Sequence, residues 1–299
     1  MAKTRNILKR VRAVGNIRTV TRAMQMVSTA RFKVVHDRVN QFSPFSTNLQ
    51  NMVADLVMRA SGERGIAHPL LTPQTGSRRD VLLVITSNRG LCGSYNSAVL
   101  KLALARLQQV RDANYDVRLH VVGGRGSRYL RFIKVGVEKE YLDFGDLPEY
   151  SRISAMADVM MSQFLGGEIS GLEVAYTQFI SGGQQKPAIV RLLPMEDLPQ
   201  SSDAGTDPSL LAPCDYLPSP ERILRRLLPN TVRLKLYQCF LDAAAAEQLM
   251  RRIAMQAATD NADDMTRELR VAANRMRQMQ ITTELSEIIG GRAGLDAKD

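Results

Sequence analysis

Two glycine-bearing loops are the places where this sequence could bind a phosphate group. Residues 84–93 follow a short apolar run and read Val-Ile-Thr-Ser-Asn-Arg-Gly-Leu-Cys-Gly. Such a loop can present backbone amides at a helix N-terminus, but it lacks the Gly-Lys-Ser/Thr of a nucleotide-binding P-loop. The second loop has Gly124 and Gly126, with Tyr129 where a dinucleotide-binding pattern needs its third glycine. We interpret both loops as tight turns and expect no cofactor.

The remaining reactive side chains do not assemble into a catalytic set. Cys92 could act as a nucleophile, but no histidine lies near it in the sequence, so a small inert residue is the simpler interpretation. Glu284 and Glu287 lie three residues apart on one helical face and could form a metal-binding or acid/base pair, but a surface pair is the simpler interpretation. The cysteines and histidines are widely spaced, which predicts neither a disulfide framework nor a metal site. They are Cys92, Cys214, Cys239, His36, His68 and His120.

The positive charge is concentrated at the N-terminus. The chain has 299 residues and a net charge of +10. Residues 1–60 contain eleven Lys and Arg but two Asp and Glu, whereas residues 219–290 contain eleven against nine. The first segment should therefore attract an acidic partner, which could be nucleic acid, anionic lipid or an acidic protein surface.

The sequence shows no targeting or membrane-spanning segment. It is charged from Lys3 onward without the apolar run of a signal peptide. No apolar stretch reaches the ~18 residues that a membrane helix needs. We expect a soluble protein of a reducing compartment.

Residues 219–290 are predicted to form one long helix that needs a partner along its length. Ser219 suits the N-cap, Pro220 suits the first helical position, and Gly290 and Gly291 provide a stop. Pro229 should kink the helix or set its start at about residue 230, and residues 259–261 are weak helix formers that predict local weakness. The apolar residues recur at steps of three and four, as in a coiled coil. They are Leu234, Tyr237, Leu241, Ala244, Leu249, Ile253, Met265, Leu269, Ala272, Met276 and Met279, with Ile281, Leu285 and Ile288 as a second stripe.

Residues 4–58 are predicted to form a second long helix, capped by Thr4 and kinked or interrupted at Pro44. Two long striped helices at the two termini suggest an antiparallel coiled coil. The stripe of this helix is Ile7, Val11, Val14, Ile17, Val20, Met24, Val27 and Val34 or Val35, then Phe45, Leu49, Met52 and Leu56.

The residues between the helices predict an inserted α/β domain. Residues 60–80 and 196–218 are rich in Gly, Pro or Ser and read as connections. Short apolar runs at 81–86, 117–122, 172–180 and 187–193 predict strands, the last two forming a hairpin across 181–183, and helices are expected at 96–110, 124–133 and 153–164. The predicted fold is α/β, with a Rossmann-like domain at 78–195 between coiled-coil helices at 1–60 and 219–291.

Three separated motifs resemble the gamma subunit of F-type ATP synthases. Residues 257–261 (Ala-Ala-Thr-Asp-Asn) and 277–291 (Arg-Gln-Met-Gln-Ile-Thr-Thr-Glu-Leu-Ser-Glu-Ile-Ile-Gly-Gly) are similar to its C-terminal signature. Residues 86–93 look like its central motif, and residues 17–27 look like its N-terminal helix. Three positions depart from the pattern: Asn88 stands where Asp is common, Ser94 where Gly is common, and Arg292 where Ala is usual.

The resemblance implies a rotor shaft without a catalytic site of its own. Its partners would be the alpha and beta subunits of the catalytic head, the epsilon subunit and the ring of c subunits, with one copy of this chain per complex and no nucleic acid. Rotation of the ring, driven by the flow of hydrogen or other ions, would drive the beta subunits through their conformations during ATP synthesis. The chain would then be a peripheral membrane protein on the cytoplasmic face of a bacterial inner membrane.

The resemblance also implies which residues contact the alpha and beta subunits of the head. They are Met24, Arg251, Arg277, Gln278, Thr282 and Glu284. For each residue the alternative is ordinary coiled-coil packing or a solvated charge.

Two other functions fit parts of the sequence. A basic coiled-coil protein that binds nucleic acid would explain the N-terminal charge, although no recognised reading motif is present. A phosphate-binding α/β enzyme would rest on the two glycine-bearing loops.

Overall fold

The computed structural model describes residues 2–60, 68–72, 78–113, 115–195 and 220–296. These residues divide into two compact units, one made of residues 1–28 and 251–299 and the other of residues 29–250. Two helices contribute to both units: α1 (Ala2–Ala60) and α5 (Pro220–Asp296). All strands lie in the second unit.

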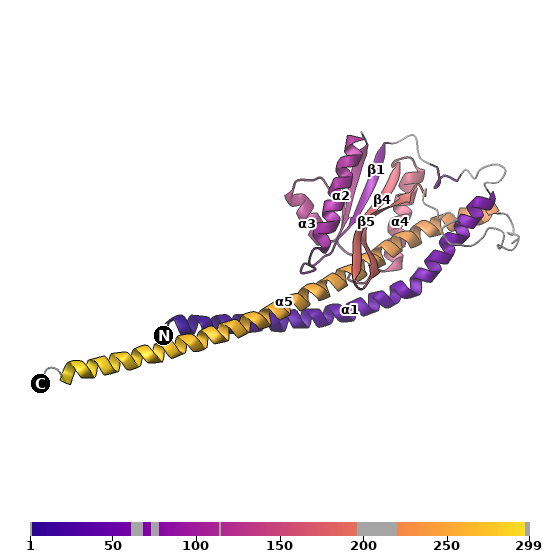
Figure 1. The fold of residues 1–299 in the computed structure, drawn as a ribbon. Helices are drawn as coiled ribbons and strands as arrows, with labels where there is room; N and C mark the ends of the chain where they lie inside the picture. Colours follow the sequence, from indigo (N-terminus) through magenta and orange to yellow (C-terminus); the bar gives the residue numbers. More distant parts are fainter. Residues whose placement is uncertain (1, 61–67, 73–77, 114, 196–219, 297–299) are drawn as a thin grey trace. The chain divides into compact units, whose positions relative to one another are not determined.

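Five strands form one mixed sheet in the order β3-β2-β1-β4-β5 (Figure 1). β1 (Arg79–Ile85), β2 (Asp116–Val122), β3 (Lys139–Tyr141) and β4 (Gly171–Ser181) are parallel, and β5 (Gln184–Leu193) runs antiparallel to β4. Parallel neighbours need crossover connections, and these contain α2 (Tyr95–Asp112), α3 (Gly124–Phe132) and α4 (Tyr150–Leu165). The predicted α/β class and the predicted hairpin are confirmed.

Both faces of the sheet are buried by helices. Val81, Leu83 and Ile85 pack with α4 and with the parts of α1 and α5 that belong to this unit. Leu82 and Val84 pack on the other face with α2 and α3. Figure 1 shows α2 and α3 on the opposite side of the strands from α4. A strand buried on both faces requires a continuous apolar run, and residues 81–85 supply it.

A bidentate ion pair holds α2 on the sheet. Arg106 Nε donates to Glu173 Oε2 at 2.8 Å, and Arg106 Nη2 donates to Glu173 Oε1 at 2.6 Å. The Glu173 side chain on β4 is 7% exposed and that of Arg106 is 34% exposed, so the carboxylate is the more desolvated partner. The hydrogen bonds to Glu173 raise the pKa of Arg106.

The terminal helices pair in each unit. In the second unit Ser46 donates to Gln238 at 3.0 Å, and the rings of Phe42 and Tyr237 meet edge to face at 5.1 Å. In the first unit residues 18, 21 and 25 of α1 meet residues 263, 259 and 256 of α5. The partner numbers fall as the α1 numbers rise, so the predicted antiparallel pairing is confirmed.

The predicted helix ends and interruptions were partly wrong. α1 begins at Ala2 instead of being capped at Thr4, and Pro44 lies inside it without ending it. α5 begins at Pro220 and continues through Pro229 and through both C-terminal glycines to Asp296. Apolar burial accounts for the continuity at Pro229, because Leu228 and Val232 are fully buried beside it. Each such side chain stabilises the helix by roughly 1.5–3 kcal/mol, which offsets the ~3 kcal/mol that an internal proline costs.

The sheet contains one strand that the sequence did not predict. β3 has three residues, Lys139, Glu140 and Tyr141, and so lacks an apolar run. The connection expected at 60–80 lies mostly outside the described residues, although Leu70 is buried and β1 already begins at Arg79. The connection expected at 196–218 lies outside them entirely.

Candidate interface on the paired terminal helices

The first unit contains a coiled-coil seam that follows strict steps of three and four. We define the seam by the residues of each helix that are buried or half-buried at this spacing. On α1 they are Ile7, Val11, Val14, Arg18, Thr21, Gln25 and Ser28, and on α5 they are Met255, Thr259, Ala262, Thr266, Leu269, Ala273 and Met276. Gln256 is exposed and does not belong to the seam, although it bonds to Gln25. The alternation is that of a heptad repeat.

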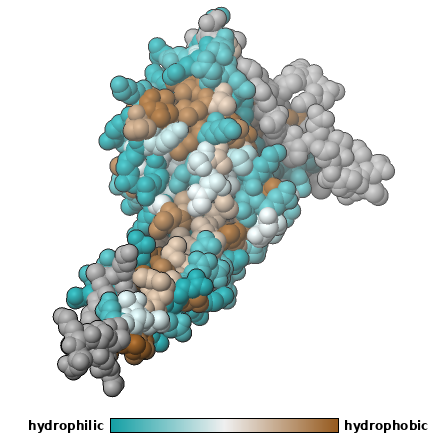
Figure 2. Space-filling model, turned by 60° about the vertical axis from the view of Figure 1, so that its left-hand side comes forward, coloured by the Kyte–Doolittle hydropathy of each residue, from teal (hydrophilic) through white to brown (hydrophobic). Residues whose placement is uncertain are grey.

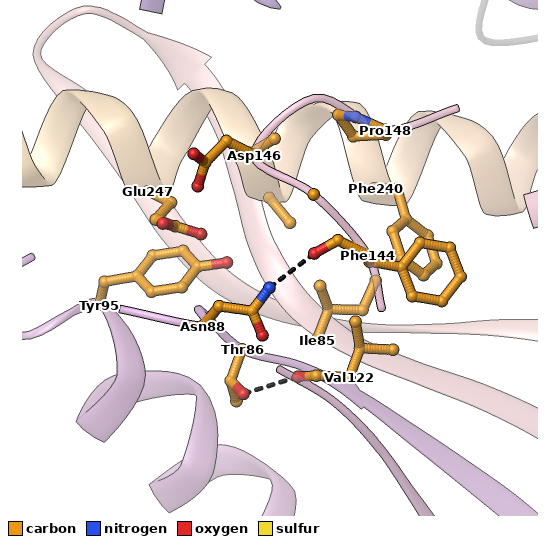
Figure 3. A pocket seen from close by; sticks show the side chains of 13 residues that line it. Ile85, Thr86, Asn88, Tyr95, Val122, Phe144, Asp146, Pro148, Phe240 and Glu247 are labelled. Atoms are coloured by element: carbon orange, nitrogen blue, oxygen red, sulfur yellow. Dashed lines mark hydrogen bonds between the residues drawn. The ribbon is translucent and has the colours of Figure 1, made fainter. Parts of the chain in front are cut away.

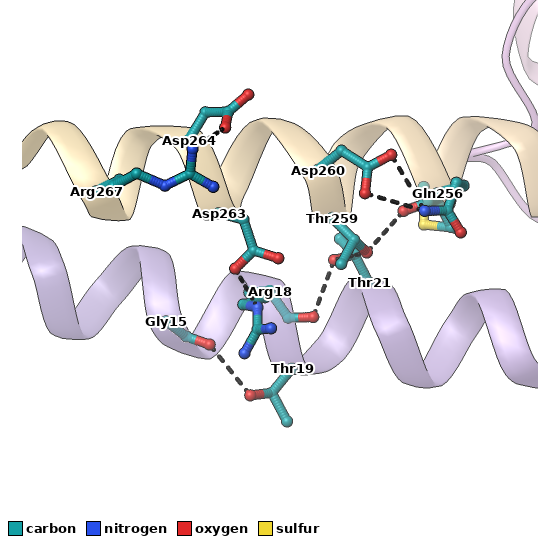
Figure 4. A network of polar contacts seen from close by, with 11 residues as sticks. Gly15, Arg18, Thr19, Thr21, Gln256, Thr259, Asp260, Asp263, Asp264 and Arg267 are labelled. Carbon is teal, nitrogen blue, oxygen red and sulfur yellow. Dashed lines mark hydrogen bonds and ion pairs between the residues drawn. The ribbon is translucent and has the colours of Figure 1, made fainter.

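The middle of the seam is polar instead of apolar (Figure 4). The hydroxyls of Thr21 and Thr259 lie 2.8 Å apart. Thr21 also donates to the Arg18 carbonyl at 3.0 Å, and Thr259 donates to the Met255 carbonyl at 2.8 Å. Each hydroxyl carries one proton. The bond across the seam therefore forms only when one threonine releases the carbonyl of its own helix.

Two further polar contacts flank the threonine pair. Arg18 forms an ion pair with Asp263, and Gln25 donates its amide to Gln256. The Arg18 and Asp263 side chains are about two-fifths exposed, so this ion pair adds less than about 1 kcal/mol of stability. Its main effect is to fix which residues face each other.

The predicted stripe diverges from this seam after Val14. Ile17, Val20 and Val27 were predicted to face the other helix, but all three are exposed, and the buried positions are Thr21 and Ser28. On α5 the predicted Ile253, Met265 and Met279 are exposed as well, whereas Leu269 and Met276 are correctly placed. The weak helix formers at residues 259–261 do not interrupt α5, and Thr259 is bonded across the seam, so the local weakness expected there stays a prediction.

Large apolar side chains lie on the outside of the paired helices. Figure 2 shows hydrophobic residues interrupting the hydrophilic surface. In a helix pair that stood alone in water, the apolar residues would occupy the seam and the polar residues would lie outside. The exposed apolar side chains here, beside a seam whose middle is polar, are expected of a surface that another protein covers. The exposed residues are Leu8, Ile17, Val20, Met26 and Val27 on α1 and Ile253, Met265, Val271 and Met279 on α5.

Residues 281–289 of α5 are exposed on all sides. The antiparallel register pairs residue 18 with 263 and residue 21 with 259, so the first residues of α1 fall opposite about residue 279. Residues 281–289 lie beyond this point and every one of them is exposed. They include Ile281, Leu285, Ile288 and Ile289, and the exposed fraction reaches 69% at Ile288.

The six residues predicted to contact the head occupy three different environments. Arg277, Gln278, Thr282 and Glu284 are exposed on α5, where the Thr282 hydroxyl donates to the Gln278 carbonyl at 3.0 Å and Glu284 accepts from Gln280 at 2.9 Å. Met24 is half-buried beside the seam, and Arg251 is 5% exposed. Four of the six side chains are thus available to another protein in this structure.

The loop at residues 86–93 is a structural turn that holds the start of α3. Asn88 Oδ1 accepts from the Gly124 amide at 3.0 Å, the Ser87 carbonyl accepts from the Arg125 amide at 3.0 Å, and Thr86 Oγ1 accepts from the Gly126 amide at 3.0 Å. These three amides are the donors that a bound phosphate would use. Because the loop already occupies them, the interpretation of this site as a turn is favoured over phosphate binding.

Two glycines make this close approach possible. Gly123 has a φ of +94°, and a Cβ atom there would lie 2.2 Å from the Thr86 carbonyl oxygen. A Cβ atom on Gly126 would lie 2.5 Å from Thr86 Oγ1. The glycine pattern that resembles a dinucleotide motif is therefore explained by contact with the end of β1.

A usable signal for the seam residues that prediction missed lies in their spacing. Steps of four and three from Ile7 lead through Val11 and Val14 to Arg18 and Thr21. Strict counting of the heptad would have found them, whereas selection by hydrophobicity moved the stripe onto Ile17 and Val20.

Comparison with known proteins identifies the family. A family model described as ATP synthase matches residues 3–295. The ATP synthase gamma chain of Rhodopirellula baltica is 38% identical over 99% of this chain and 100% of its own length. The gamma chains of Leptospira biflexa and Desulfitobacterium hafniense are 34% and 33% identical and are covered over 98% and 100% of their lengths.

Solved structures share the fold. A chain of the Euglena gracilis mitochondrial ATP synthase aligns with a TM-score of 0.68 at 16% identity, over 99% of this chain and 95% of that chain. A chain in the central stalk and c-ring structure of the Tetrahymena thermophila mitochondrial ATP synthase aligns with a TM-score of 0.58 at 20% identity, over 80% of this chain and 99% of that chain. Among the described residues of this protein, no helix combines the length and apolar character needed to cross a bilayer. With full-length relatives above 30% identity and a family model that covers almost every residue, this chain belongs to the ATP synthase gamma chain family.

Proposed function

We propose that this chain is the central rotor shaft of an F-type ATP synthase. The observation that carries the proposal is the outer surface of the paired helices, where large apolar side chains are exposed beside a seam whose middle is polar. A shaft that turns inside a sleeve of other subunits needs an outer surface with few directional bonds. Membership of the gamma chain family indicates that the surrounding subunits are the alpha and beta subunits of the head.

In this proposal the paired helices enter the head formed by the alpha and beta subunits, with one copy of this chain per complex. The second unit faces the epsilon subunit and the ring of c subunits. Rotation changes which face of the shaft each beta subunit meets. The beta conformations shift only because those faces differ in the contacts that they make.

The chain acts without a catalytic site of its own in this proposal. The occupied amides at α3 support it, because they leave that turn no donors for a nucleotide phosphate. We place the chain at the membrane as a peripheral subunit on the cytoplasmic face of a bacterial inner membrane. The comparisons lend no support to the nucleic-acid alternative.

Co-expression tests the proposal. The chain is produced with the alpha and beta subunits encoded beside it, and the purified material is examined for composition and ATP hydrolysis. A complex with three alpha, three beta and one copy of this chain is expected to hydrolyse ATP and to rotate in single-molecule assays. Failure of the chain to join alpha and beta would overturn the assignment and make a DNA gel shift at low salt the next experiment.

The proposed head contacts are tested by paired substitutions. Arg277→Ala with Gln278→Ala is expected to lower coupled ATP synthesis in membranes more than it lowers assembly. The matched control is Arg111→Ala with Gln109→Ala, which removes the same two side chains from the exposed face of α2. Equal coupling in the two variants, at equal assembly, would remove the contact role from Arg277 and Gln278.

A further inference from the structure

A buried carboxyl group lies where α5 packs against β4 in the second unit. Asp242 on α5 is 5% exposed, and its neighbours Tyr176 on β4 and Cys239 on α5 are also buried. Among the described residues, no ion pair or side-chain hydrogen bond is formed by the Asp242 carboxyl. An ionised carboxylate at such a place is unfavourable, because burial removes most of the water that would stabilise it.

The surrounding titratable groups do not neutralise a charge on Asp242. Tyr176 and Cys239 are themselves acids, and Lys235 on α5 is the cation that acts on Cys239. Burial raises the pKa of Asp242 to about 7 and that of Cys239 to about 12, and it raises the pKa of Tyr176 as well. At slightly acidic pH all three acids are therefore neutral, and the contact between α5 and β4 contains no buried negative charge.

We propose that Asp242 makes the contact between α5 and β4 sensitive to protons. With the carboxyl protonated, α5 stays packed on the sheet, and ionisation of the carboxyl favours local opening of this contact. The inference concerns the chain by itself and does not depend on the rotor assignment. The group that binds or releases the proton is the Asp242 carboxyl.

The direction of the effect follows from linkage. The folded pKa of Asp242, about 7, lies above the value of ~3.9 that an aspartate has in an unfolded chain. The folded state thus holds the proton more tightly, and the stability that results is fully present below about pH 4. It decreases as the pH rises and is lost once the pH passes 7. Between about pH 4 and pH 7 the opening equilibrium should therefore increase about tenfold per pH unit, and above pH 7 it should level off, because the carboxyl is then ionised in both states.

Hydrogen exchange of the full chain tests the proposal. Backbone amide exchange is measured by mass spectrometry between pH 5 and pH 8.5 and corrected for the intrinsic dependence of exchange on pH. In peptides that cover residues 232–246 of α5 and 172–178 of β4, the corrected exchange should increase about tenfold per pH unit below pH 7 and level off above it. Asp242→Asn removes the titrating group with little change of shape and should make the corrected exchange of both peptides independent of pH.

A control and a direct titration make the result decisive. Asp116→Asn removes an exposed carboxylate at the start of β2 and should leave the pH dependence intact. Carbon-13 NMR of aspartate-labelled protein, with Asp242→Asn used to assign the signal, should show a carboxyl titrating near pH 7. Corrected exchange that is flat between pH 5 and pH 7 in the unsubstituted chain would overturn the proposal, as would an Asp242 signal that titrates below pH 5. If Asp242→Asn does not fold, the exchange of the unsubstituted chain between pH 5 and pH 7 still supports or overturns the proposal.

Discussion

Asn88 uses both ends of its side chain. Its Oδ1 accepts from the Gly124 amide at 3.0 Å, and its Nδ2 donates to the Phe144 carbonyl at 2.6 Å. The resemblance to gamma subunits places an aspartate at this position, and an ionised aspartate can satisfy only the first partner. The asparagine therefore adds a bond between the turn after β1 and the segment that follows β3 (Figure 3).

Asn88→Asp is expected to lower the free energy of unfolding by about 1–3 kcal/mol at pH 7, because it places a carboxylate against the Phe144 carbonyl and removes the donor. The loss should become smaller at pH 4, where a protonated aspartate can donate. Urea unfolding at the two pH values measures both effects. Asn51→Asp, on an exposed position of α1, is the charge-matched control. Equal losses for the two variants would show that the bond to Phe144 contributes nothing.

The threonine pair of the seam is suited to a double-mutant cycle. Thr21→Val or Thr259→Val alone should cost about 0.5–1.5 kcal/mol, since the remaining hydroxyl stays buried beside an apolar group. The double variant should lose less than the sum of the two, with a coupling of about 1 kcal/mol. Urea unfolding of the four proteins measures the cycle. Simple additivity would mean that each hydroxyl bonds only within its own helix.

At the scale of the elements, the ion pair between α2 and β4 predicts an asymmetric response. Arg106→Ala leaves the buried Glu173 carboxylate without its partner and should cost about 3–5 kcal/mol. Glu173→Gln should cost clearly less, because Arg106 is partly exposed and can turn toward water. Thermal or urea unfolding gives both values. Similar losses for the two variants would contradict the view that desolvation falls mainly on Glu173.

The elements with strong periodic or apolar patterns were predictable from the sequence. The run at 81–85 and the hairpin strands were found because burial on two faces demands continuous apolar residues. β3 was missed because it is held in the sheet by backbone pairing with β2 at Lys139 and Glu140, and these charged residues do not form the apolar pattern that predicts a strand. The predicted seam was displaced by one residue, from Arg18 to Ile17, because apolar residues occur both in a core and on a surface that another protein covers. Contacts such as the one between Asn88 and Phe144 depend on chain segments brought together only by the fold.

At the scale of the whole molecule, the last part of α5 should be needed for function but not for folding. Removal of residues 280–299 should leave the unfolding midpoint of the chain nearly unchanged, because residues 281–289 are all exposed. The same deletion should reduce coupled ATP synthesis once the chain is assembled with alpha and beta subunits. Unfolding curves and synthesis assays on the same truncated protein test the two halves. A large loss of stability would show that this segment supports the fold itself.

The pairing of Thr21 with Thr259 joins residues 238 positions apart, and this separation has a consequence for the time at which the seam can form. The first turns of α1 leave the ribosome long before their partners on α5 exist. At the usual synthesis rate of roughly 5–20 residues per second, the interval between the synthesis of Thr21 and that of Thr259 is on the order of ten seconds or more. During that interval Ile17, Val20, Met26 and Val27 are available to any other nascent chain. The first turns of α1 therefore remain without their partner until α5 has been synthesised, and the seam is completed only then.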